Sequence, residues 1–383
     1  ILIFIISCCS GPTDNLVKYV NPLVGTPWKG NGGTLPAVGP PFAMTNFVPA
    51  TNLNAIGNIP YHYEMKEIIG FMGTHQPAVW MGDYGFVTLW PSINKVKIKP
   101  GDRKYYFSHE KEIATPYLYS VEMTSPDSAH EVKTSFSASG SCALFYFNIS
   151  LCDTAFIVVE TSRNNEFNHR SRKMFNNQYC QTIDSMREKF IGEVNIDVER
   201  NAITGYNPEW HSFHLGPELK NFKGYFVIQF EKPFNVYGCW KDTIRINPGG
   251  KQERGKWIGG YAGFLKNNEN IKVKVATSFI SIEQCYENLD REIPGWDMES
   301  LSAQVRKEWQ ERLESIRIKG TTTQKNIFYT AMYHSLLYPR NFSEGGRYYS
   351  AFDDQVHEDV EHGDQHHQAL DQHEVVARDT LHE

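Results

Sequence analysis

The sequence predicts a mostly β protein, with an N-terminal antiparallel β-sandwich followed by α-helices. Short runs rich in β-branched and aromatic residues recur, for example over 143–149, 224–230 and 272–280, with turn residues such as those at 247–250 between them. No helical period intervenes between these runs, which favours antiparallel sheets over a parallel α/β sheet. After about residue 281 the apolar spacing changes to that of helices.

Three helices are predicted after the strands. A capping box that begins at Ser281 predicts a helix as far as about residue 292, where a Pro-Gly pair follows. Apolar residues at helical spacing, with charges between them, predict a second helix over 301–316. A second capping box, at Thr321, predicts a third helix to about residue 337.

Length and charge limit the function classes. A chain of 383 residues is two to three times the commonest domain size, so we expect at least two packed units. The formal net charge is -6 and the charges of both signs are interspersed, which excludes a basic nucleic-acid-binding surface and a polybasic membrane patch. Aromatic residues make up 13% of the chain, which suits strand-rich cores and surfaces that stack on sugar rings.

The first residues resemble the end of a bacterial lipoprotein signal. A branched apolar run is followed by Ser7 and Cys8, and Cys8 would carry the lipid after cleavage. Residues 10–15 would then form a short tether, and the lipid would hold the protein outside the cytoplasm, in the periplasm or at the cell surface. The alternative is a buried strand with structural cysteines. Because these residues do not alternate as a half-buried strand does, we favour the lipoprotein signal.

The remaining cysteines do not indicate a metal or redox site. They are odd in number and contain no CxxC pair, so we expect small buried side chains, with one disulfide pair left open. These residues are Cys142, Cys152, Cys180, Cys239 and Cys285.

Residues 69–85 form the segment that most suggests a binding site. Four glycines and a proline predict a loop, in which Trp80 offers a stacking face and His75 and Asp83 offer hydrogen bonds. A sugar ring requires this combination of an apolar platform and fixed polar groups. The alternative is a structural loop whose Trp80 closes the end of the sandwich.

Five motifs in order resemble glycoside hydrolase family 92, the calcium-dependent exo-α-mannosidases of secreted glycan-degrading systems. Together they extend over nearly the whole chain up to about residue 356. The motifs are Asn21-Pro22-Leu23-Val24-Gly25-Thr26, GFMGTHQPAVWMGDYG from Gly70, Phe107-Ser108-His109-x-x-Glu112-x-Ala114-x-Pro116, Phe328-Tyr329-Thr330-Ala331-Met332-Tyr333-His334-Ser335 and Gly346-Arg347-Tyr348-Tyr349.

The resemblance implies a β-sandwich joined by helices to an (α/α)6 barrel, with the active site between them. It also implies inverting hydrolysis of terminal α-mannosyl linkages of glycans, by one carboxylic acid and one carboxylate that activates water. Calcium on the barrel side would hold the mannose hydroxyls through oxygen ligands. Trp80 matches the family's tryptophan near the leaving group, and His75 and Asp83 flank it as further substrate-binding candidates.

The expected organisation follows from the motifs and the helices. Residues 1–14 are the signal remnant and tether, 15–282 the sandwich, 283–319 a helical connector, 320–356 the truncated start of the (α/α)6 catalytic domain and 357–383 an atypical tail. In the family the acid, the base and most calcium ligands lie beyond this chain. We therefore expect no catalytic or metal-binding residue here, and no activity from this chain alone.

The tail after about residue 356 departs from the family, which continues into an aromatic segment with a Trp-Asp-Thr-x-Arg motif. Here it contains no aromatic residue, which indicates a frameshift, a misjoined piece or a premature stop rather than a divergent ending. His362 and His366 have helical spacing but no HExxH arrangement, so a solvated or disordered segment is expected rather than a metal site. Asp353 and Asp354 are expected in a solvated turn.

Two other function classes remain open from the sequence. A non-catalytic carbohydrate-binding β-sandwich would bind glycan through Trp80 and neighbouring aromatic residues. An unrelated all-β structural protein with a helical tail would require the five motifs to be coincidental.

Overall fold

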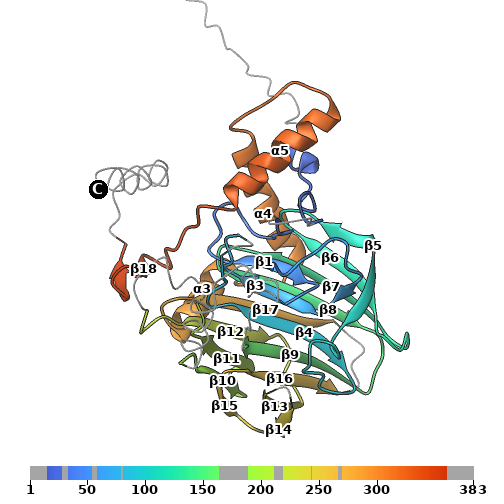
Figure 1. The fold of residues 1–383 in the computed structure, drawn as a ribbon, viewed down its shortest axis with the longest axis vertical. Coiled ribbons are helices and arrows are strands. Elements are labelled where there is room, and N and C mark those ends of the chain that lie inside the picture. Colours follow the sequence, from blue (N-terminus) through green and yellow to red (C-terminus); the bar gives the residue numbers. More distant parts are fainter. Residues whose placement is uncertain are drawn as a thin grey trace, which may run out of the picture.

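The computed structural model describes residues 15–27, 33–53, 58–78, 81–163, 189–210, 219–242, 244–265 and 270–359. Within these ranges the protein is mostly β, and the strand pairs are antiparallel. Figure 1 shows the strands stacked in layers, with helices α4 and α5 at one end of them. The predicted fold class is confirmed in its β part.

The first sheet has seven strands. In spatial order they are β1 (Asn46–Ala50), β3 (Gly70–Thr74), β4 (Val87–Ile93), β9 (Thr154–Ser162), β16 (Ile258–Leu265), β13 (Val236–Lys241) and β14 (Arg245–Pro248). β1, β3 and β4 are buried along their whole length. A smaller apolar cluster around Trp90 and Trp240 adds to the core that this sheet forms with the second sheet.

The second sheet has ten strands. In spatial order they are β15 (Gln252–Gly255), β10 (Gly192–Asp197), β11 (Ala202–Asn207), β12 (Gly224–Phe230), β17 (Ile271–Ser278), β8 (Cys142–Ile149), β7 (Glu131–Ala138), β6 (Tyr119–Thr124), β5 (Tyr105–Ala114) and β2 (Glu67–Ile68). The predicted runs at 143–149, 224–230 and 272–280 correspond to β8, β12 and β17.

The core of the sandwich lies between the two sheets. Phe71 of the first sheet contacts Phe136 and Phe145 of the second, with ring centroids 5.9 and 6.2 Å apart, and all three side chains are fully buried. Edge-to-face and tilted ring pairs of this kind add to the stabilisation that comes from removing apolar surface from water. The high aromatic content of the sequence is therefore used largely for packing.

The three predicted helices are confirmed, each with a side-chain cap. α3 (Ile282–Glu292) begins after Ser281, whose hydroxyl accepts from the amide of Gln284. α4 (Met298–Leu313) begins ahead of the predicted start at 301, because Asp297 caps it, and α5 (Thr322–Leu336) carries the full capping box at Thr321. Each cap satisfies amides that have no partner inside the helix.

The helices pack on the ten-stranded sheet and on the N-terminal segment. The indole of Trp309 in α4 donates to the carbonyl of Gly39 at 2.7 Å, and the hydroxyl of Tyr333 in α5 donates to the carbonyl of Ala37 at 2.8 Å. The short 3-10 helix η1 (Leu16–Tyr19) packs beside them. Segments 270 and 296 residues apart in sequence are thus joined through buried hydrogen bonds.

Beyond α5 the described residues form a hairpin that the sequence does not predict. It pairs β18 (Arg347–Ser350) with β19 (Gln355–Glu358), and Asp353 and Asp354 occupy its turn, as expected. Asp354 is not fully solvated, because its carboxylate accepts from the amides of Lys220 and Asn221. Residues 357 and 358 of the expected atypical tail belong to β19, whereas 360–383 lie outside the described residues.

Candidate functional site

The segment 69–85 begins as a strand rather than as the predicted loop. Gly70–Thr74 form β3, and all five residues are buried between β1 and β4. A Cβ at Gly70 would lie 3.0 Å from Thr88, and one at Gly73 would lie 3.2 Å from Phe47. These glycines thus permit close packing inside a sheet, and the loop prediction is wrong for 70–74.

Asp83 organises the loop that follows β3. Its side chain is fully buried, and one oxygen, Oδ1, accepts from the amides of His75 and Tyr84, each at 2.8 Å. The second oxygen, Oδ2, accepts from the hydroxyl of Thr74 at 2.6 Å. Hydrogen bonds to an ionised carboxylate are stronger than neutral ones. Asp83 therefore closes the loop on itself and holds both of its ends.

His75 is fully buried beneath this loop and both of its ring nitrogens are engaged. Nδ1 donates to the carbonyl of Tyr84 at 2.7 Å, which leaves Nε2 to accept from the hydroxyl of Thr45 at 2.8 Å. Burial, together with the positive charge of Arg340, lowers the pKa of His75 to about 3. The imidazole is therefore neutral at physiological pH and serves the protein's own hydrogen bonds.

Gln76 holds the turn that carries the predicted sugar platform. Its side-chain amide donates to the carbonyls of Asn58 and Met81, at 3.2 and 2.9 Å, and the amide of Met81 donates to the carbonyl of Ala78 at 3.0 Å. These bonds close the base of the turn on both sides of residues 79–80. Trp80 itself lies outside the described residues. Sequence reasoning missed Gln76, although it sits beside His75 in the same motif.

A second wall of the site comes from the segment after α5. Arg340 is buried, and its Nε and Nη1 atoms have no hydrogen-bond partner among the described residues. The side chain hydrogen-bonds Tyr84, and its guanidinium lies 5.6 Å from the ring centroid of Tyr338. Sequence reasoning missed Arg340, because a single arginine after a helix gives no signal of its burial.

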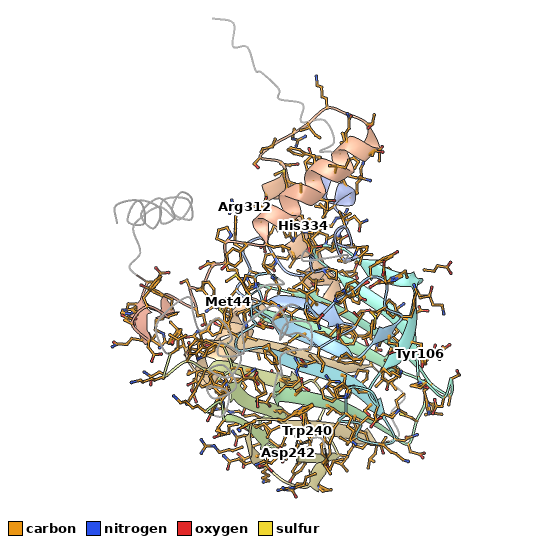
Figure 2. All side chains as sticks on the ribbon, viewed as in Figure 1. Met44, Tyr106, Trp240, Asp242, Arg312 and His334 are labelled. Carbon is orange, nitrogen blue, oxygen red and sulfur yellow. The ribbon has the colours of Figure 1, made fainter. Side chains whose placement is uncertain are left out.

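Aromatic side chains join the two walls. Phe279 lies 5.8 Å from Tyr84 and 6.0 Å from Phe342, and Phe222 lies 5.8 Å from Tyr349, measured between ring centroids. Tyr84 follows β3, whereas Phe342 and Tyr349 follow α5. Figure 2 labels Met44, a member of the same cluster, on the flank of the sandwich below the helices. The loop 75–85 thus meets the residues that come after the third helix.

Glu344 is a further buried carboxyl at this junction. Its oxygens accept from the amide of Phe279 at 2.9 Å and from the side chain of Asn288 at 2.8 Å. Burial raises the pKa of Glu344 above its ordinary value, while the hydrogen bonds from Ser278, Phe279 and Asn288 oppose that shift. The carboxyl therefore links β17, α3 and the segment after α5.

The described ranges also limit metal and membrane binding. They contain no group of three or more His, Cys, Asp or Glu side chains that could hold a metal ion. No helix in them is both long and apolar enough to cross a bilayer. Four cysteines are free and buried, as the sequence analysis expects, whereas Cys8 and Cys180 lie outside the described residues; the four are Cys142, Cys152, Cys239 and Cys285.

Two family models match successive parts of the chain. The N-terminal domain of glycosyl hydrolase family 92 matches residues 19–278, and the catalytic domain of that family matches residues 284–370. The chain belongs to glycosyl hydrolase family 92. The boundary between the two matches falls at α3, where the sequence changes from strand to helix periodicity.

Solved structures agree with this family membership. An inverting family 92 mannosidase from Bacteroides thetaiotaomicron is 29% identical, with a TM-score of 0.75, and the similarity covers 91% of this chain and 44% of that protein. A family 92 α-mannosidase of the same organism, solved with mannoimidazole, shares the fold at 22% identity, with a TM-score of 0.71 over 90% of this chain and 43% of that one.

A curated relative comes from a fungus. An uncharacterized secreted glycosidase of Arthroderma benhamiae is 21% identical over an alignment 355 positions long, which covers 86% of this chain and 42% of the relative. The chain therefore spans less than half the length of this relative and of the Bacteroides mannosidases.

Two of the family 92 motifs are brought together at the helices. The amide of Asn21, in the first motif, donates to the hydroxyl of Thr330 in α5 at 3.0 Å. The hydroxyl of Thr330 in turn hydrogen-bonds the carbonyl of Tyr19 at 3.4 Å. These motif residues therefore fix the first turn of the described chain on α5, a helix within the catalytic-domain match.

Proposed function

We propose that this chain forms the N-terminal part of a secreted, exo-acting α-mannosidase that hydrolyses terminal α-mannosyl linkages of glycans with inversion. Family membership and the likeness to an inverting mannosidase support this proposal. The observation that carries it is the junction at which the loop 75–85 meets the segment after α5. A sugar cleft shared between sandwich and barrel requires these two segments to be neighbours.

In this proposal Trp80 stacks on the sugar near the leaving group, and Gln76 fixes the turn that carries it. His75 and Asp83 contribute to the substrate site by holding the loop, since their polar atoms are already used by the protein. Their role is to fix the described residues of the loop that flank Trp80 in the sequence. Such fixed geometry lowers the entropic cost of binding.

Inverting hydrolysis requires an acid and a base whose carboxyl groups lie about 6.5–9.5 Å apart, with water between them and the sugar. At the described junction the carboxyls of Asp83 and Glu344 are both bound by protein donors. We therefore assign neither to catalysis. The acid, the base and the oxygen ligands for calcium would come from other parts of the catalytic domain, so that this chain alone is inactive.

The first test is release of mannose from α-mannobiose by the purified chain in the presence of calcium. We expect no release, and turnover would contradict the assignment of the acid and base to other parts of the domain. The second test is a chimera in which residues 19–356, the part that resembles the family, replace the corresponding segment of the Bacteroides mannosidase. It should release mannose, first as the β-anomer, and Trp80→Ala should lower its kcat/KM at least about tenfold. A folded chimera that cleaves another glycoside would refute the proposed specificity.

We also propose that the protein is extracytoplasmic and anchored through a lipid on Cys8, in keeping with a secreted fungal relative. Labelling of the expressed protein with radioactive palmitate tests this proposal. The label should disappear in Cys8→Ala, whereas Cys9→Ala should retain it. Equal labelling of both variants would contradict the anchor.

A further inference from the structure

An open groove of about 530 Å³ lies on the outer face of the ten-stranded sheet. We call it the β5 groove, since β5 forms one of its sides. Its lining includes Tyr106, Lys111, Glu122, Lys133, Asn148 and Ser150. Figure 2 shows Tyr106 on the flank of the sandwich away from Met44, so that the groove is separate from the junction described above.

The groove exists because β5 departs from its partner strand. Pairing between β5 and β6 passes from Phe107↔Met123 directly to Glu112↔Val121, so residues 108–111 lie opposite a single residue of β6. Extra residues of this kind bend a strand and re-aim its side chains. The hollow lies beside this bulge and is lined by residues of β5, β6, β7 and β8, most of them polar.

A buried polar network holds the bulge in place. His109 contacts the carboxylate of Glu112 and the carbonyl of Tyr63, each at 2.6 Å, and its ring stacks on that of Tyr63 with centroids 3.8 Å apart. The hydroxyls of Tyr61 and Tyr119 donate to the same carboxylate, which is fully buried, at 2.8 and 2.6 Å. A fully connected network of this kind is rigid, so the groove is preformed. The motif residues His109 and Glu112 thus shape this groove.

The charges that line the groove cancel. Lys111 and Lys133 lie 3.4 and 3.3 Å from the carboxylate of Glu122, and Glu131 adds a second acid. With two cations and two anions, the lining has no net charge to attract an anionic or a cationic ligand. Their hydrogen-bonding groups, with those of Asn148, remain suited to a ligand rich in hydroxyls.

Tyr106 supplies an aromatic surface at the edge of the groove. It is 43% exposed, although an aromatic side chain on a strand is usually packed. Lys104, paired with Glu67 at 2.8 Å, lies 5.7 Å from the centroid of the Tyr106 ring and holds it from one side. A volume of this size, with an aromatic surface and a few fixed polar groups, is typical of a small-ligand site.

We propose that the β5 groove binds a segment of a neutral oligosaccharide, with one sugar ring on Tyr106 and its hydroxyls on Lys133, Glu122 and Asn148. The site lies away from the junction of the loop 75–85 with the segment after α5 and requires no hydrolytic residue, so it extends beyond the proposed mannosidase activity. The groove would hold one part of a glycan chain on the sandwich while the end of that glycan reaches the proposed mannosidase site.

The test is binding of the 383-residue chain to yeast mannan, dextran and xylan in native affinity gels, followed by titration with the soluble oligosaccharide of the best binder. Tyr106→Ala removes the aromatic surface and Asn148→Trp fills the groove from an outward-facing position. We expect each to weaken binding at least about tenfold. Phe352→Ala removes a ring that is 90% exposed on the distant hairpin, and it should leave binding unchanged.

Trp80→Ala separates this inference from the proposed function. If the groove is the site, this variant still binds the polysaccharide, whatever the outcome for the chimera. Loss of binding in Trp80→Ala with retention in Tyr106→Ala and Asn148→Trp would overturn the proposal. So would a failure of the wild-type chain to bind any of the three polysaccharides, or equal losses in Phe352→Ala and Tyr106→Ala, with circular dichroism showing all variants folded.

Discussion

His75 makes the stability of the protein sensitive to acid. In the folded state its pKa is about 3, whereas the ordinary value is 6.5. Between these values the unfolded state binds a proton that the folded state does not. The free energy of unfolding therefore falls as the pH drops from about 6.5 towards 3, and it is fully retained above about 6.5.

The magnitude follows from the width of this window. At about pH 4.5 the unfolded state is protonated at His75 and the folded state is not. The free energy of unfolding is therefore about 2.5 kcal/mol lower than at about pH 7.5. His75→Asn removes the titrating group, while the asparagine amide can still donate to the carbonyl of Tyr84. The variant should be less stable than the wild type at neutral pH, and it should lose less stability on acidification.

The assay is urea unfolding of both proteins at about pH 7.5 and about pH 4.5, followed by tryptophan fluorescence and circular dichroism. Other groups titrate in both proteins and affect both equally. The quantity to compare is therefore the fall in the free energy of unfolding between the two pH values, in the wild type and in the variant. We expect the wild type to lose about 2.5 kcal/mol more than His75→Asn. Equal losses, within about 0.5 kcal/mol, would refute the conclusion that His75 is buried in its neutral form.

Three further substitutions test the junction and the helices. Asp83→Asn keeps the shape of the side chain but removes its charge from three hydrogen bonds, so urea unfolding should show a loss of about 1–3 kcal/mol, and an unchanged midpoint would contradict its role. Arg340→Gln removes a cation that adds to burial in lowering the pKa of His75, so the acid-sensitive window should narrow from its lower end when urea unfolding is extended down to about pH 3, and an unaltered pH profile would disprove that coupling. Thr321→Ala removes the capping box of α5 and should cost about 1 kcal/mol in thermal or urea unfolding, whereas Thr322→Ala, at the first helical position, should cost less, and the reverse order would contradict the cap.

The local elements follow closely from the sequence. The strands β8, β12 and β17 and the helices α3, α4 and α5 form where periodicity predicts them, because their signals depend on neighbouring residues alone. The failure at Gly70–Thr74 has a physical cause. Four glycines and a proline within seventeen residues indicate a loop, but two of those glycines lie in a strand where the side chains of Thr88 and Phe47 leave little room for a Cβ.

The candidate site is likewise predicted in part from the sequence and in part only from the tertiary structure. The sequence by itself singles out the segment with His75, Trp80 and Asp83, because its residue types suit sugar binding. It cannot show that His75 and Asp83 form their hydrogen bonds with other groups of the protein, because Thr45 and Thr74 become their partners only when the chain folds.

The sequence alone therefore determined the mostly β domain, the capped helices that follow it and the motifs of family 92, all of which are encoded in short stretches. The tertiary structure decided which of these stretches meet. It joined the loop 75–85 to Arg340 directly and to Phe342 through Phe279, and it built a groove from four strands beside the bulge at 108–111. Contacts between distant residues depend on sheet register and on close packing, and neither is visible in a local pattern.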